Sequence, residues 1–574
     1  MHDVVITGGT LVDGTGAAPR GADLAISDGR ITEVAESGAL AGTGAHRTLD
    51  ADGLLVTPGF VDIHTHFDGQ ITWDAQLTPS CWHGVTTVVM GNCGVGFAPA
   101  RPDKHEWLIG LMEGVEDIPG AALSEGIQWG WESYPEYLDA VDQLPKALDV
   151  GSQIPHGAVR AYVMGDRGAH NEPATADDIA AMAVIVREAI GAGALGVSTS
   201  RTIAHMAIDG EPVPGTFAAE DELFGIGQAL ADAGAGIFEL APAGALGEDL
   251  AAPDREMDWM RRLSAAIGRP VTFALTQNDH DPDSWSRMLE LAGDARAEGA
   301  RVRPQVAGRP VTLLLGFETF HPFAYTPSWG ELGLLPLAER VGRLRADPEL
   351  RARVVREAST PDPAMLQFLD PAKAFPLGDP PNYEPDPSES VAARAAASGR
   401  DVYELYLELL MEQEGRALIM RPLLNYTDTN LDAVREMLLH PTSAWGLGDG
   451  GAHCGTTCDA STPTFMLTHW ARDRDHDQLP LEWVIRKMTS ETASLYGLAD
   501  RGTIAPGMRA DVNLIDHAGL RLHAPEMVYD LPGDARRFVQ RADGYVATMV
   551  LGEVTLEHGE DTGARPGQLI RGAR

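Results

Sequence analysis

The stretch Val61-Asp62-Ile63-His64-Thr65-His66-Phe67-Asp68 follows a turn at Thr57-Pro58-Gly59 and carries two histidines two residues apart. Because successive side chains of a strand point to opposite faces, His64 and His66 are expected to point the same way. Imidazole is the commonest protein ligand for zinc, so the spacing predicts a site for a divalent metal ion at the end of a short strand. Two solvated histidines at a strand end are the alternative on this motif alone.

Beyond this stretch, short apolar runs alternate with alanine-rich, helix-like segments, which is the rhythm of a parallel sheet with helical crossovers. Eight such runs favour an α/β fold of the (β/α)8, TIM-like barrel type. The expected strands cover residues 60–66, 86–90, 158–164, 194–199, 236–240, 271–276, 302–306 and 444–447.

Both ends of the chain are rich in short strands and turns, which predicts one small β-domain from residues 1–57 together with 500–574. The barrel domain is then expected over residues 58–499. Within it, residues 310–440 form a long insertion between the seventh and eighth strands. The helical patterning of this insertion favours a lid or subdomain over the site rather than an unstructured loop.

The chain of 574 residues has 83 acidic and 44 basic residues and a net charge of −39. That balance repels phosphate backbones and anionic lipid surfaces, so nucleic-acid and membrane partners are not expected. No apolar run approaches the roughly 20 residues of a membrane span, the first residues enter a strand instead of a signal peptide, and four cysteines are too few for a disulfide framework. We therefore expect a cytoplasmic protein with a small-molecule substrate, and self-association into a homo-oligomer is left open.

Metal-binding side chains follow several of the expected strands, and the carboxyl ends of barrel strands meet at one mouth. Cys93 follows the second strand, Glu239 ends the fifth and Asp449 follows the eighth. Together with His64 and His66 they supply nitrogen, sulfur and oxygen donors of the kinds that zinc binds.

Three further residues follow the fourth and eighth strands. Arg201 and His205 could hold a substrate carboxylate or carbonyl, Arg201 by bidentate pairing. A salt bridge within the loop is the alternative for this pair. His453 is expected either beside the metal ligands or in the packing of the last helix.

Five segments stand out along the chain: PGFVDIHTH at 58–66, GVTTVVMGNCG at 84–94, GALGVST at 193–199, GDGG at 448–451 and IAPGMRAD at 504–511. Together they make the chain resemble the amidohydrolase superfamily and, within it, the N-acyl-D-amino-acid deacylase (D-aminoacylase) family. The first and last segments occur across the superfamily, whereas the Gly-Asn-Cys-Gly element is more specific to the deacylase branch.

The resemblance implies a (β/α)8 barrel with a small β-sandwich built from both termini. It implies that His64 and His66 are metal ligands, that Cys93 is a cysteine ligand, and that Asp449 binds the metal and carries a proton. The implied cofactor is Zn²⁺ or a similar divalent metal, as one or two ions.

Two departures from the family pattern bear on the number of metal ions. Many binuclear members bridge their metals with a carboxylated lysine, and this chain has no lysine between Lys146 and Lys373. The histidines that the family places at the ends of strands five and six are replaced by Glu239 and Gln277. We therefore favour one ion at the histidine pair, while a second ion at Glu239 is the alternative, because carboxylates also bind zinc.

The expected activity is metal-dependent hydrolysis of a C–N amide bond in an N-acyl amino acid or a related small amide, not in the peptide backbone of proteins. Metal-activated water would be the nucleophile, with Asp449 as general base. A cyclic amide, lactone or carbamate is a second substrate hypothesis, since a fold does not fix a substrate. A non-catalytic amidohydrolase-like scaffold is a third hypothesis, which the missing strand-five and strand-six histidines support.

Overall fold

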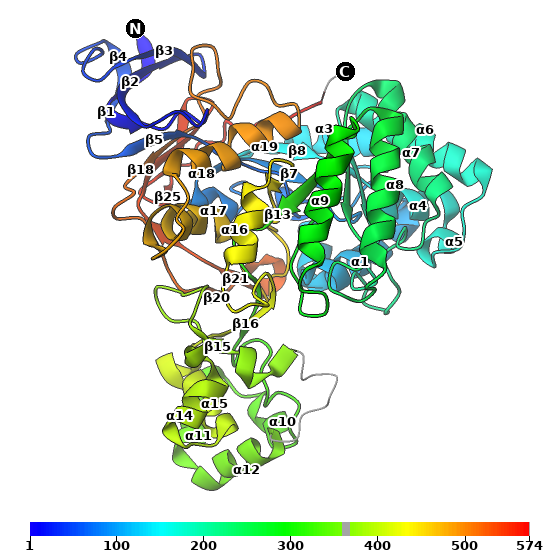
Figure 1. Cartoon of the computed structure of the whole chain (residues 1–574), viewed down its shortest axis with the longest axis vertical. Coiled ribbons are helices and arrows are strands. Elements are labelled where there is room, and N and C mark those ends of the chain that lie inside the picture. The colour runs from blue at the N-terminus through cyan, green and yellow to red at the C-terminus, as the bar shows by residue number, and fades with distance from the viewer. Residues whose placement is uncertain (359–367, 573–574) are drawn as a thin grey trace.

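The structure is a computed structural model, and it describes residues 1–358 and 368–572. Figure 1 shows an α/β body, with strands from the start of the chain on one flank and a smaller, mostly helical part extending below. No helix in these two ranges is long and apolar enough to cross a membrane.

Two parallel sheets form the centre of the body. The first has the order β6-β7-β8 and the second the order β17-β13-β12-β11-β10-β9. Only Gln153 separates β8 from β9, and Thr65 beyond β6 pairs in parallel with Gly450 beyond β17. The carboxyl ends of the first and last strands therefore lie side by side. The bounds are β6 Phe60–Asp62, β7 Val85–Met90, β8 Asp149–Ser152, β9 Ile154–Pro155, β10 Gly196–Ser200, β11 Ile237–Ala241, β12 Val271–Ala274, β13 Val302–Val306 and β17 Ala444–Trp445.

Helices pack on the outside of these strands, and α6 to α9 contact one another in sequence order. The longest, α6, begins with a capping box between Thr175 and Asp178 and ends at Gly193, whose φ of 117° suits a residue without a side chain. The bounds are α1 His105–Glu116, α2 Gly120–Gly126, α3 Tyr134–Gln143, α4 His156–Met164, α5 Asp166–Ala169, α6 Ala176–Ala192, α7 Glu220–Ala233, α8 Ala252–Ile267, α9 Ser284–Ala297, α16 Asp432–Leu439, α17 Thr462–Phe465, α18 Leu481–Met488 and α19 Ser490–Leu495.

One of the eight expected strands is wrong. Residues 158–164 lie in helix α4, and the strand at this place in the order is β8 with β9. A short apolar run fits a buried strand and a buried helix equally well, so its pattern alone does not separate the two. The strand itself was missed because it is short and contains Asp149 and Ser152 among its four residues. The other seven expected strands overlap strands of the structure.

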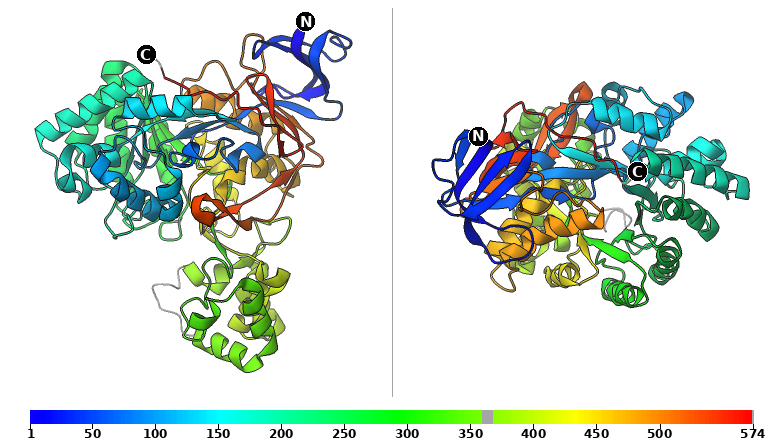
Figure 2. Two further views of the ribbon diagram at one scale, coloured as in Figure 1. Left: turned by 180° about the vertical axis from the view of Figure 1, so that it is seen from behind. Right: turned by 90° about the horizontal axis from the view of Figure 1, so that it is seen from above.

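Strands from both ends of the chain form one nine-stranded sheet, as Figure 2 shows from above. Its order is β25-β24-β23-β18-β5-β1-β2-β3, with β4 paired to β1. The junction of the two ends is the antiparallel pairing of β18 with β5. The bounds are β1 His2–Leu11, β2 Arg20–Ser27, β3 Arg30–Glu36, β4 Ala45–Asp50, β5 Leu55–Pro58, β18 Val512–Ile515, β23 Tyr545–Val550, β24 Glu553–Glu557 and β25 Glu560–Asp561.

The chain leaves this sheet between β18 and β23 and reaches the body. The antiparallel pair β20 (Glu526–Leu531) and β21 (Ala535–Val539) is fixed there by Arg537, whose guanidinium donates to Thr78 O at 3.0 Å and to Thr78 Oγ1 at 2.8 Å. The short strands β19 (Arg521–Leu522) and β22 (Ala542–Asp543) also pair with each other. This C-terminal segment thus covers the side of the body where Thr78 lies.

The segment between β13 and β17 contains the helical part below the body in Figure 1, which has a hydrophobic cluster of its own from Leu315 to Ile419. A three-stranded sheet, β14-β16-β15, joins this part to the body. Helix α16 returns to pack on α9 and β13. The bounds are β14 Val311–Leu315, α10 Trp329–Leu332, α11 Leu337–Ala346, α12 Pro348–Ala358, β15 Phe375–Pro376, α14 Val391–Ser398, α15 Val402–Leu410 and β16 Ile419–Leu424.

Candidate metal centre

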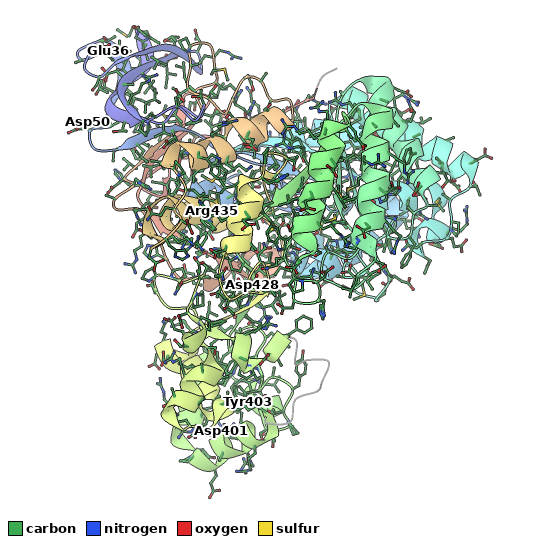
Figure 3. All side chains as sticks on the ribbon, viewed as in Figure 1. Glu36, Asp50, Asp401, Tyr403, Asp428 and Arg435 are labelled. Atoms are coloured by element: carbon green, nitrogen blue, oxygen red, sulfur yellow. The ribbon has the colours of Figure 1, made fainter. Side chains whose placement is uncertain are left out.

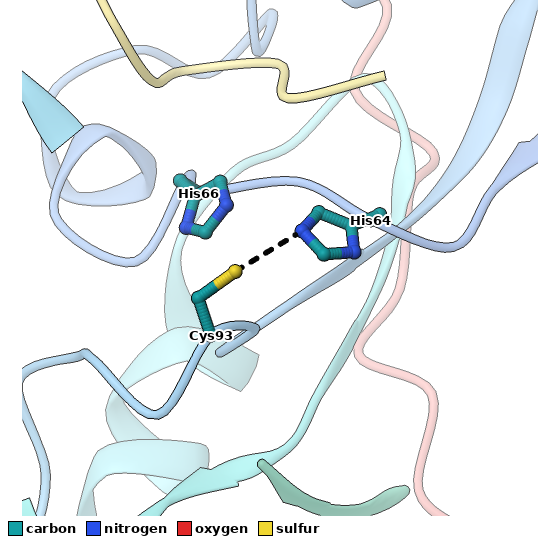
Figure 4. Close-up of side chains that lie close together, drawn as sticks. All are labelled: His64, His66 and Cys93. Carbon is teal, nitrogen blue, oxygen red and sulfur yellow. Dashed lines mark hydrogen bonds between the residues drawn. The ribbon is translucent and has the colours of Figure 1, made fainter. Parts of the chain in front are cut away.

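Three buried donor atoms converge at the carboxyl ends of β6 and β7. One ligand atom each of His64, His66 and Cys93 lies within 4.8 Å of the others, and Figure 4 shows the three side chains facing one another. The thiol Sγ of Cys93 is 3.4 Å from Nε2 of His64. In the described chain these are the three residues that form such a compact group.

Asp449 adds an oxygen donor beside the histidine pair. Its Oδ1 lies 3.4 Å from Nε2 of His64 and 3.7 Å from Nε2 of His66. Ligands bound to zinc at 2.0–2.3 Å in a tetrahedron are about 3.3–3.8 Å apart. The spacing and the chemistry of these donors therefore fit a zinc-type ion held by the two histidines, with Asp449 and Cys93 flanking it.

The opposite ring nitrogens of the two histidines have their own polar partners. Nδ1 of His64 is 3.0 Å from Oε1 of Gln305, and Nδ1 of His66 is 3.3 Å from Oε1 of Glu116. Because Gln305 Oε1 is an acceptor, we assign the His64 ring proton to Nδ1, which leaves Nε2 of His64 free to bind a metal. The contact of His66 with Glu116 is an ion pair, since neither Nδ1 of His66 nor Oε1 of Glu116 has a hydrogen-bond partner in the described chain. Both histidines are 1% exposed, so their orientation is fixed by these contacts and by packing.

Glu116 was not identified from the sequence, because it ends helix α1 and does not follow a strand. A signal was present: Glu116 shares the buried face of α1 with Leu108 and Met112, eight and four residues earlier. A carboxylate on the apolar face of a helix costs free energy unless it has a partner. Here that partner is His66.

The turn after β7 explains how Cys93 reaches the histidines. Gly91, Cys93 and Gly94 have φ of 78°, 55° and 73°. Asn92 locks the turn, donating to Thr65 O at 3.0 Å and Val89 O at 2.9 Å. Positive φ at a non-glycine residue is strained, and such strain is found at functional sites.

Asp449 lies in a second turn of the same kind, with φ of 46°. Its backbone N–H donates to His64 O at 2.9 Å, which ties the end of β17 to the end of β6. A side chain at Gly448 would meet Oδ2 of Asp62 at 2.2 Å, so this approach needs glycine. The Gly-Asp-Gly-Gly segment thus has a steric reason for its composition.

The electrostatics of the site depend on burial and on the histidine pair. Burial opposes ionisation of Asp449, but hydrogen bonding to His66 and the charges of both histidines hold the pKa of this carboxyl below its usual range. Burial also opposes the charged form of His66, yet Glu116 and Asp449 raise the pKa of His66 to about 9. Burial, with Glu239 nearby, raises the pKa of the Cys93 thiol. A bound divalent ion would favour the thiolate, because its positive charge stabilises the deprotonated sulfur.

Glu239 lies on the far side of His64. Its Oε2 accepts from the backbone N–H of Cys93 at 3.0 Å, and its Oε1 is 3.8 Å from Nδ1 of His64 without a hydrogen-bond partner in the described chain. Burial raises the pKa of Glu239 to about 8. The side chain therefore supports the turn at Cys93 and faces the nitrogen of His64 that points away from Asp449.

Gln277 is directed away from the histidines. Its Nε2 donates to Oδ2 of Asp428 at 2.6 Å, and its Oε1 accepts from Thr427 N at 3.3 Å. Figure 3 labels Asp428 near the junction of the body and the insertion. His280 lies in the exposed loop after β12.

The three remaining candidate residues differ in placement. Arg201 donates to Ala218 O at 2.7 Å and lies 3.5 Å from Glu256, so it binds its own loop. His205 is half-buried, with Nδ1 3.0 Å from Ser200 Oγ, and burial together with the charge of His453 lowers the pKa of His205 to about 3. Nε2 of His453 is 3.8 Å from Oε2 of Glu116, behind His66.

Comparison with known proteins gives the same family along nearly the whole chain. The family model described as "Amidohydrolase family" matches residues 47–556. The D-aminoacylase of Alcaligenes xylosoxydans xylosoxydans is 27% identical over 99% of this chain and 97% of its own length.

Two solved structures share the fold. A structure of D-aminoacylase aligns with a TM-score of 0.66 and 24% identity over the full length of both chains. That structure was determined to define the functional role of the binuclear metal centre in D-aminoacylase. The N-acyl-D-glutamate deacylase of Bordetella bronchiseptica, complexed with zinc and a phosphonate inhibitor, aligns with a TM-score of 0.64 and 23% identity over 99% of both chains. The chain is a hydrolase that belongs to the amidohydrolase family.

Proposed function

We propose that this enzyme hydrolyses the C–N amide bond of an N-acyl amino acid or a related small amide, with one divalent metal ion, Zn²⁺ in particular. The observation that carries the proposal is that Oδ1 of Asp449 lies 3.4 Å from Nε2 of His64 and 3.7 Å from Nε2 of His66, beside the Cys93 thiol. Zinc is also the metal in the N-acyl-D-glutamate deacylase complex.

In this proposal His64, His66 and Asp449 hold the ion, with Cys93 adjacent or ligating. When bound, the ion supplies Lewis-acid polarisation of the scissile carbonyl and lowers the pKa of water. Asp449 is ionised at neutral pH because its pKa lies below the usual range, so Oδ1 can accept the proton of the attacking water and return it to the leaving nitrogen. Glu116 and Gln305 act as positioning residues through the two histidine rings.

The surroundings of the site favour an apolar group on the substrate. Large apolar side chains are exposed on the loops that follow β10 and β11, namely Ile203, Met206, Ile208, Phe217, Leu246 and Leu250. These loops leave the same carboxyl ends of the strands as the histidine pair does, and exposed apolar residues at such a place are typical of ligand-binding surfaces. The similarity to D-aminoacylase supports an N-acyl-D-amino acid as the substrate class.

We also propose the larger architecture of the family for this chain: a (β/α)8 barrel over residues 58–499, a β-sandwich domain from 1–57 with 500–574, and a lid within 310–440. The continuity from β8 through Gln153 to β9 and the Thr65–Gly450 bridge support closure of the parallel strands. The separate hydrophobic cluster supports the lid as a subdomain. All four cysteines are buried and unpaired, which supports a reducing compartment such as the cytoplasm.

A substrate panel with zinc-loaded protein tests the proposal. The panel contains N-acetyl-D-amino acids with apolar side chains, their L-enantiomers, a hydantoin, a lactone and a carbamate. We expect amide hydrolysis that the Asp449→Asn variant loses. Turnover of only the hydantoin, lactone or carbamate would move the function to that bond, and no turnover of any member with zinc bound would favour a non-catalytic scaffold.

A further inference from the structure

A cavity of about 800 Å³ lies at the opposite ends of the strands from His64. Pro270 and Val302, at the amino ends of β12 and β13, line its floor, and residues of α9, α18 and α19 line its walls. Figure 1 shows these helices beside β13 in the upper part of the body. The cavity is therefore separate from the candidate metal centre.

Five cationic side chains line this cavity and only one carboxylate does. The cations are Arg296, Arg301, Arg303, Arg486 and Lys487, and the carboxylate is Glu491. In a chain with 83 acidic and 44 basic residues, a surplus of four positive charges in one cavity opposes the overall balance. Positive charge concentrated in a concavity attracts anions, because the low-dielectric walls focus its field.

Two of the cations share the single carboxylate. Lys487 Nζ donates to Glu491 Oε1 at 3.0 Å and to Ser443 O at 2.9 Å. Arg303 Nη2 lies 3.3 Å from the same Glu491 oxygen and donates to Ser443 O at 3.1 Å. The negative charge of Glu491 is thus already divided between two partners.

The other three cations have no carboxylate within ion-pair distance in the described chain. Arg296 donates to the carbonyl of Pro441 at 3.1 Å. Arg301 and Arg486 are exposed at the rim of the cavity, and no side-chain hydrogen bond or ion pair fixes them within residues 1–358 and 368–572. Their guanidinium groups remain available to a ligand.

The like charges disfavour one another where they are buried. Burial lowers the pKa of Arg303; Glu491 raises it, while Arg296 and Arg301 lower it. Burial likewise lowers the pKa of Lys487, where Glu491 again opposes the shift and Arg303 and Arg486 add to it. A multiply charged anion between these groups would relieve the repulsion.

We propose that this cavity is a binding site for a small, multiply charged anion that carries phosphate or carboxylate groups. Guanidinium groups pair with both through two parallel hydrogen bonds, and the buried Lys487 adds a point charge in the wall. The volume lies within the about 300–1,000 Å³ of small-molecule sites. Trp483 and Leu439 give the wall an apolar surface for the organic part of such a ligand.

Titration calorimetry on the full, metal-loaded chain at about 0.15 M salt tests this site. The probes are fructose 1,6-bisphosphate for phosphate and tricarballylate for carboxylate, because stronger chelators would remove metal from the other site. We expect saturable binding of at least one probe at one site per chain. The probe that binds with the higher affinity shows whether the site prefers phosphate or carboxylate groups.

Charge-reversal variants test whether the anion binds in this cavity. Arg301→Glu and Arg486→Glu should each weaken the affinity about tenfold or more, as expected for losing a charge-assisted hydrogen bond. Arg20→Glu makes the same change in total charge at an exposed residue of β2 and should leave the affinity unchanged. Arg301→Gln, which removes charge without adding an acid, is the substitute if a reversed charge impairs folding.

Two results would overturn the proposal. One is the absence of saturable binding for both probes. The other is binding that the two cavity variants weaken no more than Arg20→Glu does, because the anion would then bind elsewhere, including at the metal centre.

Discussion

The two sides of the candidate metal centre have kept different kinds of residue. The ends of β6, β7 and β17 bring His64, His66, Cys93 and Asp449 together within a few ångströms. The end of β11 brings only the Glu239 carboxylate near His64, and beyond β12 the Gln277 side chain bonds Thr427 and Asp428 instead.

We infer from this difference that the two sides have different roles. On the first side the candidate ligand atoms face one another, Nδ1 of His64 contacts Gln305 at 3.0 Å, and Nδ1 of His66 forms an ion pair with Glu116 at 3.3 Å. On the second side the Glu239 carboxylate accepts a hydrogen bond from the backbone N–H of Cys93. The backbone N–H of Gln277 donates to the side chain of Asn425, which follows β16. We propose that the first side holds the metal ion and that the second side supports the fold around it.

Removing the histidine pair should have the largest effect. The double variant His64→Ala/His66→Ala should lose bound zinc. Its amide hydrolysis should fall by more than about 10⁴-fold, which is the upper end of the loss expected when a single acid–base group is removed. Elemental analysis and a turnover assay measure the two effects, and circular dichroism checks the fold. His46→Ala, at an exposed histidine of β4, is the control. Full zinc content in the double variant would show that the metal binds elsewhere.

Asp449→Asn keeps the shape of the side chain and removes its basicity. Turnover should fall by about 10²–10⁴ because the general base is lost. Zinc content must be measured on the same preparation, since Asp449 is also a candidate ligand. Near-normal turnover at full zinc occupancy would exclude the proton-transfer role.

Glu116→Gln should weaken zinc binding while leaving some activity. A partner that orients a metal-bound histidine typically contributes about 10–100-fold in metal affinity or activity. Competition with a zinc chelator measures the affinity. Glu106→Gln changes an exposed carboxylate on the same helix α1 and should have no effect. Equal affinities in the two variants would remove Glu116 from the account.

Gln277→Ala should have the smallest effect on the metal. It removes the hydrogen bonds to Thr427 and Asp428 and should lower the free energy of unfolding by about 1–2 kcal/mol. Denaturant unfolding measures this loss, while zinc content and affinity should stay as in the parent chain. A fall in zinc content would mean that the second side contributes to the metal site after all.

The part of the site that local geometry dictates could be predicted from the sequence. His64 and His66 lie two residues apart just beyond β6, so their spacing keeps them close together, and the turns around Cys93 and Asp449 carry glycines that the backbone requires. Family membership was also predictable, since the motifs run along the whole chain in order. These features depend on short segments of the chain, so a single sequence is enough to recognise them.

The rest depended on contacts between distant segments. Glu116 meets His66 only because helix α1 ends beside the segment that follows β6, and Gln305 meets His64 across 241 residues. Arg201 appeared suitable for a substrate, but its loop folds so that carbonyl groups of residues 215 and 218 occupy it. The wrong strand prediction at 158–164 also reflects distant contacts, because an apolar run does not show whether it will be buried as a strand or as a helix.

The number of zinc ions per chain tests the central claim, that a single ion binds on the histidine side. Protein purified without chelator is analysed by elemental mass spectrometry, in parent form and as Glu239→Ala. The account predicts close to one ion per chain in both proteins. Two tightly held ions in the parent, with one lost in Glu239→Ala, would show that Glu239 builds a second metal site and would contradict the account.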